Sequence, residues 1–428
     1  IYRSAALGEY LAVTFLPAIV YGLWLLYCHT DDAKARRRGG LILALGYSAL
    51  LQCHMINTEI AVLAGAVFCL LLWRKTLRST VLFTWLKACA LAILLNLWFL
   101  VPFLTVATNK LYIGYEPLNI QSSGQSIMAL FNNNDAFAIG PGVLLYGALA
   151  VLLLCAIKEI ARPWRIIAGV SLWFGAMGVW MSTEHFPWNT IAQIPGISIL
   201  TVIQFPWRYN TLATIGLIVA LLAAMAGLAQ TRFAHWNKAM MLTCMGIAVC
   251  GVLSYWGYWI PQMQSVSIID TSQLAYSGNS NIAYRMDELY QPKPITVTQD
   301  GYVPSQQVTS TTLGDFIQEK GVTTVEYHEY LGQEGYVEFP LFYYPGYALV
   351  QGEGTVIPTV NGLVGVVVPA NSSGTLSIAY REPLRWRLAD LISAGTVLAL
   401  AGWKFFRICR RKVADRGKEC GPGGLEFC

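Results

Sequence analysis

The chain has 428 residues, of which 55% are hydrophobic and only 12% are charged, whereas a typical soluble domain is roughly 25% charged. Several apolar runs reach about 18 to 25 residues, which is enough to cross a hydrocarbon core of roughly 30 Å. This composition excludes an ordinary soluble protein and indicates a polytopic membrane protein. The net charge of +5 does not indicate nucleic-acid binding, because the basic residues lie in small clusters beside apolar spans.

The apolar runs predict nine transmembrane helices. Two of them form a tight pair at 40–73 and are short, so this pair is either two full spans or a re-entrant hairpin. The expected fold is a polytopic α-helical membrane protein with an all-β domain, resembling a sandwich or jelly roll, before the last helix. The predicted spans are 9–28, 40–56, 59–73, 81–105, 142–157, 166–182, 211–229, 239–258 and 388–406.

The loops between these spans alternate in their Lys and Arg content. The positive-inside rule places the basic loops in the cytoplasm, so residue Ile1 is expected outside and the C-terminus inside. An outside start with neither Met nor a signal sequence predicts that upstream spans are missing and that this chain is a fragment. The basic clusters are Lys34 with Arg36–Arg38, Arg74 with Lys75 and Arg78, Lys158 with Arg162 and Arg165, Arg232 with Lys238, and Arg407 with Arg410–Lys412.

The predicted domains follow from this topology. Residues 1–260 form a transmembrane helical domain with outer loops at 106–141 and 183–210, and the first of these loops is expected to hold a short helix near Ile127–Phe131. The last span, at 388–406, leads into a cytoplasmic tail at 407–428. No CxxC pair or His/Cys cluster indicates a metal site, and no cofactor is expected.

Residues 261–387 differ in composition from the rest of the chain and predict an extracytoplasmic β domain. They contain twelve Asp and Glu against six Lys and Arg, and no cysteine, which fits a fold without disulfides. Alternating polar and apolar runs separated by Gly, Pro and Asn turns indicate strands. These runs are Thr296–Thr298, Thr323–Tyr327, Tyr336–Phe342, Leu363–Val368 and Thr375–Tyr380.

The stretch from Ile203 to Asn210 is the strongest candidate for a polar site at the outer membrane surface. It combines a helix-breaking Pro206, an interfacial Trp207 and Arg208, the single basic residue of the second outer loop. The planar guanidinium group of arginine suits phosphate oxygens. We therefore interpret Arg208 as a candidate phosphate clamp, with helix capping at the interface as the equally weighted alternative.

Other polar residues face the same side in the predicted topology, so they are expected to converge on one cleft. A functional cluster would use the carboxylates as base or metal ligand and histidine as acid or base. The alternative is a set of interfacial residues that cap helix ends, which we favour for Glu59 and His185. The candidate substrate-binding residues are Arg208, Trp207, Gln204, Glu184, His185, Glu9 and His54; the catalytic residue is not identified.

An aromatic segment from Phe339 to Tyr347 within the β domain has two interpretations. It is either a platform for sugar stacking or a core strand that leads into a Pro-Gly turn, and we favour the core strand. Two charged residues near span ends, Lys87 and Asp390, are interpreted as interfacial anchors rather than as functional groups.

Three motifs carry a resemblance to a known family. Glu9–Ala12 leading to Phe15–Pro17, then Gln204–Arg208, then Tyr343–Tyr347 in the outer β domain resemble bacterial YfhO-like membrane proteins and the group labelled "6-pyruvoyl-tetrahydropterin synthase-related". The resemblance covers most of residues 1–406. The pterin label implies no chemistry here, because the sequence has no histidine cluster for that enzyme's zinc.

The resemblance extends to GT-C glycosyltransferases, which take a sugar from a polyprenyl-phosphate donor at the outer face. It implies a multi-pass protein of the bacterial cell membrane that acts on a cell-envelope glycan acceptor, with no nucleic-acid partner. The family's catalytic acid lies in an outer loop after its first span, which this chain lacks, so only a donor-phosphate role for Arg208 carries over. The alternatives are a transporter or flippase of a lipid-linked sugar or polymer, and a non-catalytic glycan-binding protein.

Overall fold

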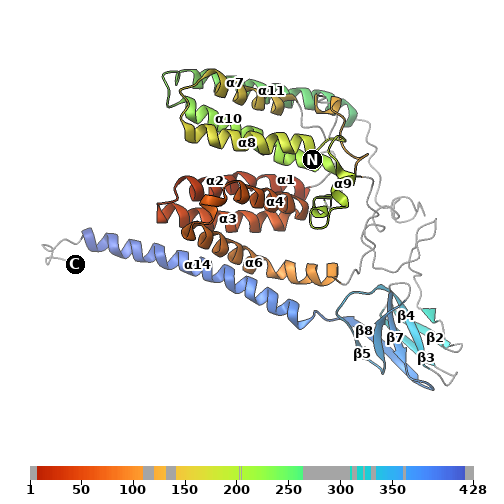
Figure 1. Ribbon diagram of the computed structural model, residues 1–428. Helices are drawn as coiled ribbons and strands as arrows, with labels where there is room; N and C mark the ends of the chain where they lie inside the picture. The colour runs from red at the N-terminus through yellow and green to blue at the C-terminus, as the bar shows by residue number, and fades with distance from the viewer. Residues whose placement is uncertain are drawn as a thin grey trace. The chain divides into compact units, whose positions relative to one another are not determined.

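The computed structural model describes residues 7–108, 120–131, 141–201, 203, 205–263, 309–310, 316–321, 323–328, 334–359 and 363–419. This part of the chain is mostly helical, with a small antiparallel sheet region near the C-terminus (Figure 1). The chain divides into two compact units, residues 1–92 with 117–268 and residues 93–116 with 269–428. Each unit is described by itself.

The first unit is built from helices and holds every residue of the candidate site. Its α-helices are α1 (Leu7–Val13), α2 (Leu16–Cys28), α3 (Ala33–Cys53), α4 (Met55–Leu71), α5 (Trp73–Thr76), α7 (Pro141–Ala156), α8 (Arg162–Met181), α9 (Trp188–Ala192), α10 (Asn210–Leu228), α11 (Trp236–Met263) and the first half of α6 (Ser79–Thr108). Its 3₁₀ helices are η1 (Met128–Phe131), η2 (Ser198–Thr201) and η3 (Pro206–Tyr209).

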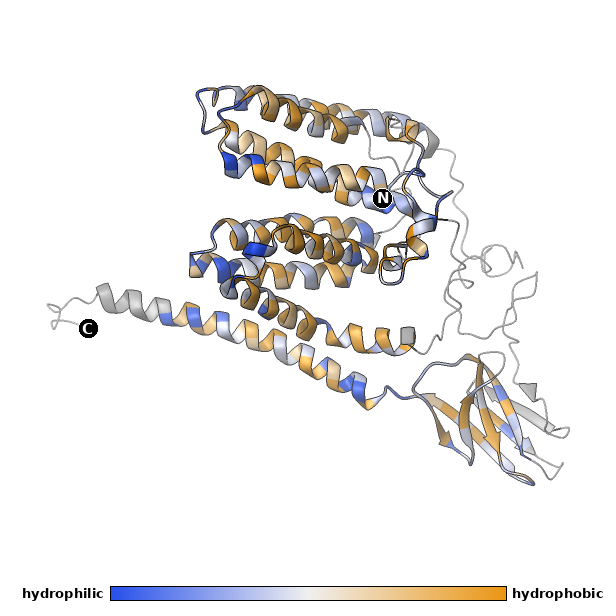
Figure 2. Ribbon diagram, viewed as in Figure 1, coloured by the Kyte–Doolittle hydropathy of each residue, from blue (hydrophilic) through white to orange (hydrophobic). Residues whose placement is uncertain are grey.

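Six helical stretches in the described part of the chain are long and apolar enough to cross a membrane. They are Leu11–Cys28, Ser79–Val106, Arg162–Met181, Pro206–Leu228, Trp236–Tyr258 and Leu384–Arg410, and two shorter apolar helices are α4 and α7. Hydrophobic residues cover most of the length of these helices (Figure 2). Many of their large apolar side chains are exposed, which is costly in water but favourable in lipid. The coarse prediction of a helical membrane protein is therefore supported.

Each predicted span coincides with helix, but several boundaries were wrong. The first span, predicted as 9–28, is two helices, α1 and α2, with a break before Pro17, which stands in the first turn of α2. The first turn of a helix tolerates proline, because backbone N–H groups there have no acceptor within the helix. The fixed φ of proline also favours the start of a helix. Helix α3 begins at Ala33 rather than at 40, because the Asp32 side chain accepts a hydrogen bond from Lys34 N at 2.8 Å and caps the helix.

The pair at 40–73 is joined by a single residue. His54 alone interrupts the helical backbone, with φ −159° and ψ 113°, between the end of α3 and the start of α4. At 1.5 Å per residue, the 21 residues of α3 measure roughly 31 Å, the thickness of a hydrocarbon core. The first turns of α3 are strongly basic, however, so α3 is not among the helices that are long and apolar enough to cross a membrane, and α4 is a shorter apolar helix of 17 residues.

Small residues let α8 and α10 approach closely, and the two helices run side by side (Figure 1). A Cβ atom added to Gly216 would lie 2.5 Å from Gly175 N, and one added to Gly178 would lie 2.5 Å from Ala213 N. Interfaces of this kind are typical of helices that associate in membranes, where close backbone packing replaces the hydrophobic driving force. This contact fixes the start of α10, where the candidate site lies.

The second unit contains a sandwich of two four-stranded antiparallel sheets. One sheet has the order β1 (Thr309–Ser310), β4 (Gly335–Phe342), β7 (Leu363–Val368), β6 (Thr355–Pro358); the other has the order β2 (Phe316–Gly321), β3 (Thr324–His328), β8 (Ser373–Tyr380), β5 (Tyr347–Gln351). Side chains from both sheets share one core, which includes Val325, Val337, Phe339, Val364 and Leu376. The alternation of the sequence therefore indicated the correct architecture.

Four predicted strands match β3, β4, β7 and β8, and Thr296–Thr298 lies outside the described residues. Strands β1, β2, β5 and β6 were not predicted. Strand β6 has only four residues and ends in Pro358, so it lacks the alternating run of residues from which the other strands were predicted. The core interpretation of the aromatic segment is confirmed, because Phe339 is fully buried and Tyr343 and Tyr347 pack against the same cluster.

The last helix, α14 (Leu384–Glu419), is longer than expected. The predicted span ended at 406 with a tail from 407, but the helix continues through the basic residues to Glu419. Lys and Arg have high helix propensity, so the charges that end an apolar span do not end the helix. Within the second unit, α14 contacts the end of α6: Ser393 Oγ donates to Leu94 O at 2.9 Å and accepts from Trp98 N at 3.1 Å.

Candidate functional site

Arg208 stands at the start of α10, in the 3₁₀ turn η3 that opens with Pro206. Its Nη1 donates to Ile203 O at 2.7 Å, and its Cζ lies 5.4 Å from the Phe205 ring centroid and 5.5 Å from that of Trp207. The guanidinium group is thus half-buried, with its plane held by a carbonyl and two aromatic rings. The groups that hold the Arg208 guanidinium all belong to residues near it in the sequence, as the order of proline, tryptophan and arginine indicated.

Glu9 comes from α1, about 200 positions earlier in the sequence, and lies close enough to Arg208 to interact electrostatically. It is only 3% exposed. Burial raises the pKa of its carboxyl group above the ordinary value of 4.5, because the charged form loses hydration, and the positive charge of Arg208 opposes that shift. Burial therefore favours the neutral carboxyl group of Glu9, whereas the positive charge of Arg208 favours the ionised carboxylate.

His54, at the joint between α3 and α4, also lies close enough to Arg208 to interact with it electrostatically. Burial lowers the pKa of its imidazole, and the charge of Arg208 lowers it further. Its Nδ1 accepts a hydrogen bond from Asn57 N at 3.2 Å, which places the proton of the neutral ring on Nε2. Asn57 Nδ2 in turn donates to Glu9 O at 3.4 Å. The hydrogen bonds of Asn57 thus connect α1 to the joint between α3 and α4, beside Arg208.

A second carboxylate, Glu59, lies on the next turn of α4, close enough to Tyr209 to interact electrostatically. Its Oε1 is buried and has no hydrogen-bond partner within the described ranges. Buried carboxylate oxygens are costly unless they accept hydrogen bonds. Glu59 was interpreted above as a helix-capping residue, but the N-cap of α4 is His54.

Trp188 packs against Tyr209, the residue that follows Arg208, and was not predicted as a site residue. It is fully buried, stacks on Tyr209 with ring centroids 5.5 Å apart, and contacts Phe186 at 4.5 Å. Its Nε1 has no hydrogen-bond partner among the residues the structure describes. The sequence did contain a signal: Glu184–Trp188 repeats the charge, proline and tryptophan of the later stretch.

Two glutamines connect the loop before α7 to the loop between α8 and α10. Gln121 Nε2 donates to Glu184 O and, at 2.9 Å, to Phe186 O, while its Oε1 accepts from Asn189 N at 3.2 Å. Gln125 exchanges backbone hydrogen bonds with Ser182 and Glu184, and its Oε1 accepts from Asn210 Nδ2 at 2.9 Å. These bonds hold the two loops together beside the start of α10. No sequence motif pointed to either glutamine.

The structure brings together only part of the predicted site. Glu9, His54, Trp207 and Arg208 lie in one region, which we call the arginine cluster, defined as these four residues with Glu59 and Trp188. Glu184 and His185 are exposed on the loop, and Glu184 contributes backbone groups to the connection with Gln121 and Gln125. Gln204 lies outside the described residues.

The arginine cluster combines one cation, two carboxyl groups, an imidazole and two indoles at one end of the helices. Such a set suits a ligand that carries both an anionic group and hydroxyl groups, because arginine binds phosphate oxygens while carboxylates accept from hydroxyls. Within the described ranges, no group of three His, Cys, Asp or Glu side chains is arranged to hold a metal ion.

No family model, curated protein or solved structure matches the chain.

Proposed function

We propose that this protein is an integral membrane glycosyltransferase of the GT-C type that uses a polyprenyl-phosphate-linked sugar to modify cell-envelope glycans. The donor phosphate binds Arg208 in the arginine cluster, and the β domain and both outer loops lie on the extracytoplasmic face. The observation that carries this proposal is the convergence of Glu9, His54 and Arg208, from three distant parts of the sequence, at one end of a set of apolar helices.

The chemistry of the cluster supports a phosphate-linked sugar as the ligand. A polyprenyl chain requires a lipid-facing approach, and Arg208 stands at the first turn of a helix whose length and composition suit a membrane. A sugar also presents hydroxyl donors, for which the carboxyl groups of the arginine cluster are suitable acceptors.

Transfer of labelled sugar from polyprenyl phosphate to envelope glycan tests the proposal. We expect Arg208→Ala to reduce transfer about 10- to 100-fold, since a charged hydrogen-bonding contact is worth roughly 1.5–3 kcal/mol. Arg208→Lys keeps the charge but loses the planar fork, so transfer is expected to fall less. Arg232→Ala is the matched control, because Arg232 is exposed and lies at the opposite end of α10.

Two results would contradict the proposal. Equal transfer by wild type and Arg208→Ala, at equal levels in the membrane, removes Arg208 from the site. Donor-dependent movement of the lipid-linked sugar across vesicle membranes without any transfer product assigns the protein to the transporters instead.

A further inference from the structure

Two helical joints lie away from the arginine cluster, at the opposite ends of α3 and α4. Helix α3 runs from the first joint, which connects it to α2, up to His54, and α4 runs from His54 to the second joint. The second joint contains the short helix α5 and ends where α6 begins at Ser79. Both joints are therefore separated from His54 by the length of a helix.

Tyr27, near the end of α2, holds the two joints together. Its hydroxyl group is hydrogen-bonded to Thr76 Oγ1 at 2.7 Å and accepts from Trp85 Nε1 at 3.1 Å. Its backbone carbonyl accepts from Lys75 Nζ at 3.3 Å. Residues that are 48 and 49 positions apart in the sequence thus lie in contact, and the two joints form one surface of the first unit.

This surface carries much more positive than negative charge. Four Lys and Arg with two Asp occur at 28–40, three Lys and Arg occur at 70–80, and no Asp or Glu occurs between Glu59 and Glu116. Among the residues that the structure describes, none of these seven cations forms an ion pair. We call them the basic surface: Lys34, Arg36, Arg37, Arg38, Arg74, Lys75 and Arg78.

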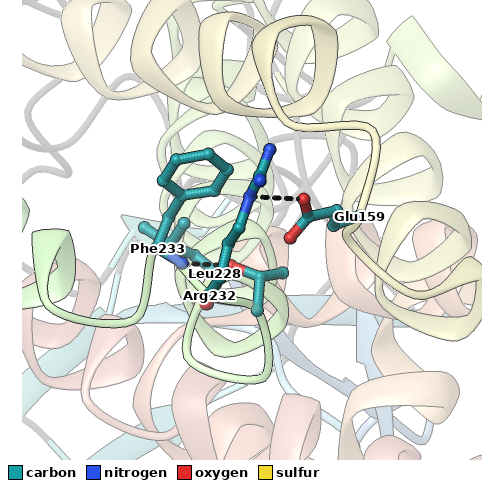
Figure 3. A network of polar contacts seen from close by, with 5 residues as sticks. Glu159, Leu228, Arg232 and Phe233 are labelled. Atoms are coloured by element: carbon teal, nitrogen blue, oxygen red, sulfur yellow. Dashed lines mark hydrogen bonds and ion pairs between the residues drawn. The ribbon is translucent and has the colours of Figure 1, made fainter.

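The joint between α10 and α11 shows the opposite arrangement. Figure 3 shows Arg232 of that joint beside Glu159, with Nε 2.8 Å from Oε1, and its Cζ lies 4.7 Å from the Phe233 ring centroid. The charge of Arg232 is therefore compensated within the protein, whereas the basic surface leaves its charge available to an external anion.

Large apolar side chains are exposed beside the cations of the second joint. Trp73 is 54% exposed and Leu77 is 60% exposed, and the Arg74 guanidinium lies over the Trp73 ring, 5.5 Å from its centroid. An exposed tryptophan beside basic residues at the end of an apolar helix is typical of the level of the lipid headgroups. The joint between α7 and α8 differs, because its Trp164 packs against a buried cluster.

We propose that the basic surface binds the phosphate groups of anionic membrane phospholipids, with Trp73 and Leu77 inserted among the headgroups. Arg74 and Arg78 contact the phosphates, because the planar guanidinium group suits phosphate oxygens. The ligand is a lipid and not a soluble anion, because the cations alternate with exposed apolar side chains that are costly in water. This surface is separate from the arginine cluster and does not depend on the proposed glycosyl transfer.

Native mass spectrometry of the detergent-purified chain tests the proposal with two lipids of identical acyl chains. We expect phosphatidylglycerol to be retained about ten-fold better than phosphatidylcholine. The double variant Arg74→Gln with Arg78→Gln should lower retention of phosphatidylglycerol about five-fold or more, since each cation near an anionic surface is worth roughly that factor, and should leave phosphatidylcholine unchanged. Trp73→Ala should weaken retention of both lipids by the same factor, because it removes no charge.

Lys158→Gln with Arg162→Gln is the matched control, because it removes the same charge from exposed positions of the joint between α7 and α8. It should keep the wild-type preference. Equal retention of both lipids by the wild type overturns the proposal, as does a loss in the control equal to that in the Arg74 and Arg78 variant. Displacement of phosphatidylglycerol by millimolar inorganic phosphate would also overturn it, in favour of a free anion.

A measurement on the wild type alone decides the outcome if the double variant does not fold. Ionic interactions at an exposed surface are screened by salt, so the preference for phosphatidylglycerol should decrease strongly between ionic strengths of about 0.1 M and about 1 M. A preference that does not change with ionic strength would contradict binding by the basic surface.

Discussion

The protonation state of Glu9 decides whether a negative charge lies near the Arg208 guanidinium group. Burial raises the pKa of Glu9, so its ionised form disfavours the folded state. The contribution of this group to stability is fully present below the ordinary value of 4.5 and is lost as pH rises through the raised folded value. Over the same window the ionised Glu9 increasingly neutralises Arg208 and repels an anionic ligand.

We therefore predict that affinity for the polyprenyl-phosphate donor falls as pH rises from about 4.5 upward. Glu9→Gln mimics the protonated form and should abolish this fall, which titration of donor binding at several pH values measures. Glu184→Gln, an exposed carboxyl outside the cluster, is the control and should keep the wild-type pH dependence. A wild-type affinity that rises with pH would show that Glu9 does not compete with the ligand.

At the scale of elements, the helices were predictable and their joints were not. Apolar runs of span length mark helices in a membrane protein, because every backbone group must be satisfied internally. The break before Pro17, the cap at Asp32 and the single extended residue His54 depend on local hydrogen bonds that hydropathy does not register. The candidate site shows the same limit. Arg208 had a local signal in the sequence, whereas Gln121 forms hydrogen bonds between two loops and Trp188 packs against Tyr209, and neither of these two residues was predicted.

The close contact between α8 and α10 carries a stability prediction. Gly216→Ala adds a Cβ atom 2.5 Å from Gly175 N, so the helices must separate. We expect a loss of about 1–3 kcal/mol, typical of overpacking. Gly246→Ala in α11 is the control: nothing lies within 4 Å of its added Cβ, and alanine favours helix by up to about 1 kcal/mol. Thermal unfolding in detergent should separate the two variants, and equal stabilities would contradict the proposed packing.

At the scale of the whole molecule, the orientation of the chain in the membrane is a prediction from its basic clusters. A cysteine at Gly374 tests it, because the site lies in β8, is exposed and has open space around its Cβ position. We expect a membrane-impermeant maleimide to label Gly374→Cys in intact cells. The wild type serves as the control, since its cysteines are expected in the spans or at the cytoplasmic end. Labelling only after the cells are opened would reverse the orientation.

We propose one account of the arginine cluster and of the two loops held by glutamines: this end of the helices binds a lipid-linked phosphate sugar. The most direct measurement is equilibrium binding of a polyprenyl-phosphate sugar to the protein in lipid nanodiscs, compared between wild type, Arg208→Ala and Arg232→Ala. The account predicts that Arg208→Ala weakens binding about 10-fold or more and that Arg232→Ala binds as the wild type does. Equal affinities for wild type and Arg208→Ala would contradict it.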